Sequence, residues 1–149
     1  MQPVELNRTK VICSAIVLLV FLLGAWGALS IDVFHTINDI LQKNSIVDIN
    51  VYALWVPVGF LGAIGYFIVA FSIAIITGKR TDTVWGERGQ RLTVKIVGLF
   101  AVLGLVSAFA TYQWMTGELE KNGYVFSKED SRFSAFGRHE VYLKTKPLM

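Results

Sequence analysis

Four side chains could in principle hold a metal ion or serve as acid and base groups. Asp32, His35 and Asp39 are three and then four residues apart, so a helix places them on one side. His139 lies far along the chain and could complete a carboxylate and histidine site with them. The solvated face of an amphipathic helix explains the same spacing, and no second histidine lies near either one. We therefore expect no metal site and no cofactor.

Nucleophilic and nucleotide-dependent chemistry have no sequence signature either. The single cysteine, Cys13, lies inside an apolar run, so it forms no intramolecular disulfide and resembles a small hydrophobic side chain. The stretch that begins at Gly78 lacks the upstream glycine of a phosphate-binding loop. We expect a protein that is not an enzyme. A membrane enzyme with its groups on the outer face remains an alternative, in which replacing Asp32, His35, Asp39 or His139 abolishes activity.

The composition indicates a membrane protein. Hydrophobic residues make up 54% of the 149, and the mean hydropathy is +0.53, above the roughly 45 to 50% apolar content of soluble domains. The net charge of +3 comes without a basic stripe interleaved with aromatic residues, so we expect no nucleic-acid partner. The expected partners are the lipid bilayer and another protein.

Three apolar runs are long enough to cross a bilayer as helices: 11–29, 52–76 and 96–114. They predict a transmembrane bundle over 1–114 and an extracytoplasmic C-terminal tail over 115–149. The first run, preceded by Arg8 and Lys10, can also be interpreted as a cleaved signal peptide.

Basic residues and aromatic residues predict the same orientation. Lys and Arg gather before the first span and between the second and third, which favours a cytoplasmic N-terminus and an outer tail. Tryptophan and tyrosine prefer headgroup depth, and they fall at the outer ends of the spans (Trp26, Tyr52, Trp55, Tyr112 and Trp114).

The two segments outside the bundle suggest secondary structure of their own. Residues 31–50 predict a short amphipathic helix at the outer interface, with Phe34, Ile37 and Leu41 on its apolar side. In the tail, 124–126 and 141–143 look like two strands of a hairpin, which must pack on the outer loop or pair with another protein. The predicted fold class is thus an all-α, three-span membrane protein with a small hairpin tail.

The spans contain no Asp, Glu, Lys, Arg or His, which argues against a pump, channel or carrier acting alone. Small residues recur four apart in each span, a spacing that lets helices pack closely. Such a face can serve the bundle itself or a foreign helix. The candidate partner-binding residues are the second-span glycines and the tail aromatics (Gly59, Gly62, Gly65, Tyr124, Phe133, Phe136 and Tyr142).

Two short motifs carry a resemblance to known proteins. The stretch 52–59, YALWVPVG, and the stretch 119–124, LEKNGY, resemble small enterobacterial inner-membrane proteins of an uncharacterised family. The overall plan is also similar to colicin immunity proteins and to phage superinfection-exclusion proteins. The resemblance implies a protein of the bacterial inner membrane, with a periplasmic tail, that protects its host by binding an incoming toxin or phage component. An accessory or assembly subunit of a larger membrane complex is the alternative.

Overall fold

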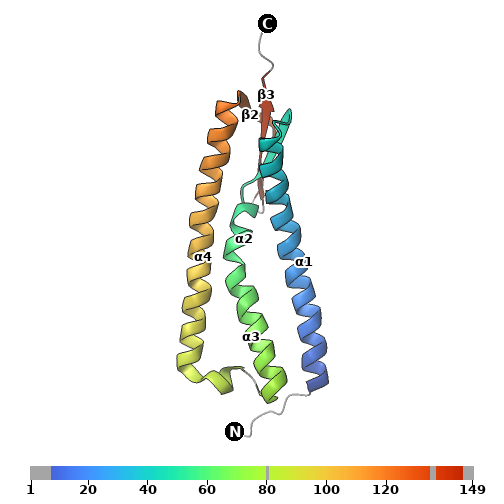
Figure 1. The fold of residues 1–149 in the computed structure, drawn as a ribbon, viewed down its shortest axis with the longest axis vertical. Coiled ribbons are helices and arrows are strands. Elements are labelled where there is room, and N and C mark those ends of the chain that lie inside the picture. Colours follow the sequence, from blue (N-terminus) through green and yellow to red (C-terminus); the bar gives the residue numbers. More distant parts are fainter. Residues whose placement is uncertain (1–7, 80, 135–136, 146–149) are drawn as a thin grey trace.

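The fold consists of three long helical segments side by side, with a small sheet at one end (Figure 1). The computed structural model describes residues 8–79, 81–134 and 137–145. In chain order the elements are α1 (Arg8–Leu41), β1 (Ile46–Asn50), η1 (Ala53–Trp55), α2 (Val56–Gly59), α3 (Leu61–Thr77), α4 (Thr81–Lys121), β2 (Tyr124–Ser134) and β3 (Gly137–Lys144).

The first helix is longer than the predicted span. α1 has 34 residues, or about 51 Å, against roughly 30 Å of bilayer hydrocarbon. The amphipathic helix predicted for 31–50 is wrong as a separate element: 31–41 continues α1, and 46–50 forms a strand. No glycine or proline lies between Leu29 and Leu41, so the helix continues past the predicted span.

α1 ends in a Schellman motif built on a lysine. Lys43 has φ 56°, and the amides of Lys43 and Asn44 donate to the carbonyls of Ile40 and Asp39 at 3.1 and 3.0 Å. Glycine normally occupies this left-handed position because it has no Cβ. The sequence therefore gives little indication of where α1 ends.

The predicted second span is a bent pair of helices. The segment from Ala53 to Gly59 meets α3 at a bend of 41°, and Phe60 lies between them. Pro57 stands in the first turn of α2, where its missing amide costs no hydrogen bond. α1 and α4 are each long and apolar enough to cross a membrane, and the bent pair adds a third candidate span.

The third predicted span, 96–114, lies inside a helix that begins much earlier. α4 has 41 residues, and Gly86 breaks it with φ 60° and ψ −169°, a conformation open essentially to glycine alone. Residues 81–95, which lie between the second and third predicted spans, are therefore helical as well. The short piece before Gly86 crosses from the end of α3 to the long part of α4 (Figure 1), and Thr81 Oγ1 donates to the carbonyl of Ala70 on α3 at 3.2 Å.

The sheet has three antiparallel strands in the order β1-β3-β2. The predicted strands at 124–126 and 141–143 are confirmed within β2 and β3, and β1 is an addition from the outer loop. Both edges of β3 are thus paired inside the chain. A bulge interrupts β2 between Ser127 and Arg132.

One apolar core joins the sheet to the ends of the two long helices. Val47, Ile49, Met115 and Leu119 are fully buried there. The remaining members are Val33, Ile40, Ala53, Leu54, Tyr124 and Tyr142. We call this unit the head: α1 from Ser30, β1, η1, α4 from Met115, β2 and β3. Below it, only 6% of the residues in the most apolar windows of α1 and α4 are buried, so these helices are compatible with membrane insertion.

Candidate functional site

A buried carboxylate lies where the head meets the helices. The Glu140 side chain is 2% exposed and projects from β3 towards α4. Arg138 Nε donates to its Oε1 at 2.7 Å, and the hydroxyls of Tyr112 and Tyr142 donate to its Oε2 at 2.8 and 3.1 Å. Both carboxylate oxygens are therefore satisfied, as a buried charge requires.

This arrangement suits a structural link between β3 and α4 better than a catalytic acid or base. Glu140 is enclosed, and its oxygens already accept three hydrogen bonds, so no substrate reaches them. The bonds link β3 to α4 across 28 residues of sequence. Sequence reasoning missed Glu140, although Arg138, Glu140 and Tyr142 alternate along β3 as residues on one face of a strand do.

Two phenols of the head are expected to make its stability sensitive to alkaline pH. Burial raises the pKa of Tyr142 well above its ordinary value of 10.0. Burial, with the nearby Asp39 carboxylate, also raises the pKa of Tyr124. The folded head thus favours the protonated phenols, so their contribution is complete below pH about 10 and is lost as the pH rises through the folded values.

We therefore expect the stability of the head to be constant up to pH about 10 and to fall above it. Tryptophan fluorescence and near-ultraviolet circular dichroism measure this change. Tyr124→Phe removes one ionising phenol and should make the alkaline loss less steep. Tyr52→Phe, at an exposed position between β1 and η1, is the matched control. Loosening that begins well below pH 10 would contradict this assignment.

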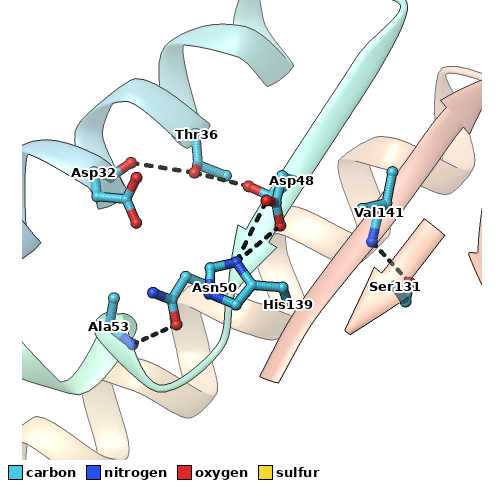
Figure 2. Close-up of polar contacts among 8 residues, drawn as sticks. All are labelled: Asp32, Thr36, Asp48, Asn50, Ala53, Ser131, His139 and Val141. Atoms are coloured by element: carbon cyan, nitrogen blue, oxygen red, sulfur yellow. Dashed lines mark hydrogen bonds and ion pairs between the residues drawn. The ribbon is translucent and has the colours of Figure 1, made fainter. Parts of the chain in front are cut away.

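The predicted metal-ligand group is not brought together. His139 Nδ1 lies 3.3 Å from both carboxylate oxygens of Asp48 on β1, and Figure 2 shows the two side chains facing each other. Asp39 accepts a hydrogen bond from Asn44 Nδ2 at 2.7 Å, and His35 is exposed on α1. Among the residues that the structure describes, no group of three His, Cys, Asp or Glu side chains could hold a metal ion.

A buried hydroxyl ties α1 to the sheet beside that pair. Thr36 Oγ1 lies 3.1 Å from the carbonyl oxygen of Asp32 and 3.0 Å from that of Asp48 (Figure 2). Asn50 Oδ1 accepts the amide of Ala53 at 3.3 Å, which fixes the turn from β1 into η1. These polar groups are used to hold the head in place.

The candidate glycines differ in what surrounds them. A Cβ on Gly62 would lie 2.7 Å from Phe100 Cβ, and one on Gly104 would lie 2.5 Å from Gly59 Cα. Gly59 and Gly62 are thus covered by α4 of the same chain. Gly65 is exposed, and a Cβ there would meet no atom within 4 Å.

The candidate aromatics fall into two groups. Tyr124 and Tyr142 are buried in the head, where the Tyr124 hydroxyl donates to the carbonyl of Asn44. Phe133 is 56% exposed on β2, with the Arg138 guanidinium 5.7 Å from its ring centre. Phe136 lies outside the described residues.

No family model, curated protein or solved structure matches the chain. The resemblance to enterobacterial inner-membrane proteins remains a prediction.

β2 forms one outer edge of the sheet. Thr145 N donates to the carbonyl of Gly123 at 3.1 Å, so Gly123 and Thr145 form a hydrogen-bonded pair. In an antiparallel sheet hydrogen-bonded and non-hydrogen-bonded pairs alternate along the strand. The Val125 amide therefore faces β3, and the Phe126 amide faces away from it. Val125 and Phe126 are 58% and 41% exposed. In the described part of the chain, β2 pairs with no strand other than β3.

Proposed function

We propose that this chain is a membrane-anchored binding protein that captures another protein along the free edge of β2. Its role is protective and stoichiometric: it meets an incoming toxin or phage component at the outer face of a bacterial inner membrane. The single observation that carries the proposal is the outer edge of β2, where the Phe126 amide faces away from β3 beside the exposed apolar side chains of Val125 and Phe126. The strand is held on apolar helices.

An open edge of this kind favours strand addition. An extended segment of a partner adds to the sheet by main-chain hydrogen bonds, while alternate side chains give specificity. Val125 lies in one cross-strand row with Leu143 and Ile46, and Ile46 is 59% exposed. This row extends the apolar surface from the edge across the outward side of the sheet.

The distribution of charge supports a head on the outer side. Basic residues outnumber acidic ones at the end of the helices opposite the head (Lys10, Lys79, Arg88, Arg91 and Lys95), whereas acidic residues outnumber basic ones in the head. Segments 51–77 and 96–117 carry no charged residue, and the head contains acidic as well as basic side chains. Positive charge beside a span resists translocation, so the basic end is proposed to be cytoplasmic.

The edge proposal predicts that a proline at position 126 abolishes capture. Phe126→Pro removes an amide that faces away from β3, and proline is tolerated on the solvent side of an edge strand. Phe126→Ala loses the same aromatic ring, which contacts Tyr142 at a centroid distance of 5.7 Å, but keeps the amide. We expect at least a tenfold larger loss of partner affinity for the proline variant, measured by titration of the full chain in nanodiscs with the captured protein. Equal losses in the two variants would contradict strand addition.

An accessory subunit is the second candidate, favoured by an exposed, mostly apolar face on α1. Cys13, Ser14, Val17, Leu18 and Phe21 form this face. A helix of a larger complex would fit such a surface. This candidate predicts rapid degradation of the chain when it is expressed alone, whereas the protective protein accumulates.

A further inference from the structure

A cavity lies at the opposite end of the molecule from the head, between α3 and the start of α4. Its volume is about 610 Å³, within the usual range for small-molecule sites. A smaller hollow of about 130 Å³ shares Tyr66, Trp85, Thr93 and Val97 with it and extends to Gly62 and Gly65. Together they form a groove along the two helices, which we call the α3–α4 groove.

Glycines and the break in α4 keep this groove open. Gly65 and Gly98 have no atoms within 4 Å of where a Cβ would lie, so the space beside them is unfilled. Gly86 turns the short piece of α4 across the end of the groove, where Thr81 and Trp85 line it. The groove is therefore built into the backbone and does not depend on one movable side chain.

We propose that the α3–α4 groove binds one anionic phospholipid of the cytoplasmic leaflet, with an acyl chain in the groove and the phosphate at its basic end. The proposal depends on membrane insertion and is independent of capture by β2. Val94, Val97 and Gly98 offer an apolar wall, while Thr81, Gln90 and Tyr66 add polar groups. Trp85 suits the depth where chain and headgroup meet.

Charge selects the anionic class of lipid. Lys79 lies two residues before the lining residue Thr81, and Arg91 follows the lining residue Gln90; both are exposed. Arg88 is exposed one turn earlier, and the Glu87 carboxylate is 3.3 Å from Arg91 Nη2 in a solvent-exposed ion pair. Basic pockets between membrane helices on the cytoplasmic side favour anionic headgroups.

The test uses the full chain in nanodiscs of phosphatidylcholine and phosphatidylglycerol, with retained lipid counted by native mass spectrometry. The wild type should retain about one phosphatidylglycerol per chain. Gly98→Leu fills the groove and should lower retention at least tenfold. Gly24→Leu, at an exposed glycine of α1 that also has no neighbour within 4 Å, should retain the lipid.

A variant that lacks two basic side chains tests the lipid proposal even if Gly98→Leu fails to fold. Lys79→Gln with Arg91→Gln changes exposed side chains and should weaken the preference for phosphatidylglycerol about fivefold for each charge removed. Unchanged retention in a folded Gly98→Leu variant would overturn the site. Equal retention of the two lipids by the wild type, or an unchanged preference in the charge variant, would overturn the anionic assignment.

Discussion

Replacing Glu140 by alanine is expected to lower the free energy of opening of the head by about 3 kcal/mol, because it removes charged hydrogen bonds from a buried site. The variant leaves the Tyr142 hydroxyl buried without its acceptor. The Arg138 side chain is 49% exposed and can turn to solvent, which limits the cost.

The measurement is hydrogen exchange of the β3 amides in nanodiscs, which should accelerate on the order of a hundredfold. Glu140→Gln keeps the shape and part of the hydrogen bonding, so its effect should be intermediate. Glu120→Ala, at an exposed position of α4, should change the opening free energy by less than about 0.5 kcal/mol. A wild-type exchange rate in Glu140→Ala would show that the hydrogen bonds of Glu140 do not stabilise the head.

The second large effect is expected where α2 crosses α4. Gly104→Ala places a methyl group 2.5 Å from Gly59 Cα and 2.7 Å from Gly59 N, both backbone atoms that cannot rotate away. The helices must separate, at a cost of about 2 to 3 kcal/mol. The hydrogen bond of 3.0 Å from Trp55 Nε1 to the carbonyl of Ala101 should weaken with them.

Gly98→Ala is the matched control, six residues earlier on the same helix, where a Cβ meets nothing within 4 Å. It should melt within a few degrees of the wild type, while Gly104→Ala should melt lower and shift Trp55 fluorescence. Identical melting of the two variants in detergent would mean that the Gly59 contact does not hold the bundle.

The sequence predicts the apolar spans and two of the three strands, because hydropathy and alternation are local signals. It does not predict β1, since α1 before it ends in a motif in which Lys43 takes a left-handed conformation that glycine usually adopts. The alternation of Ile46, Val47, Asp48 and Ile49 is visible in the sequence, but it is too short to outweigh the helical spacing around it.

The candidate site was predicted only in part for a similar reason. Small residues four apart predict close helix packing, and Gly59 does meet Gly104, but spacing alone does not say whether the partner helix is foreign. The environment of Glu140 depends on Tyr112, which is 28 residues away and lies on another element. Such a contact exists only after the chain has folded.

The central proposal is that the head captures an incoming protein and so protects the membrane. It is tested most directly by expressing the chain in a sensitive bacterium and scoring survival and membrane potential against a panel of pore-forming toxins and temperate phages. We predict selective protection against one agent, lost in Phe126→Pro and largely kept in Phe126→Ala. Stable expression with no protection across the panel, or protection that Phe126→Pro leaves intact, would contradict capture at the β2 edge.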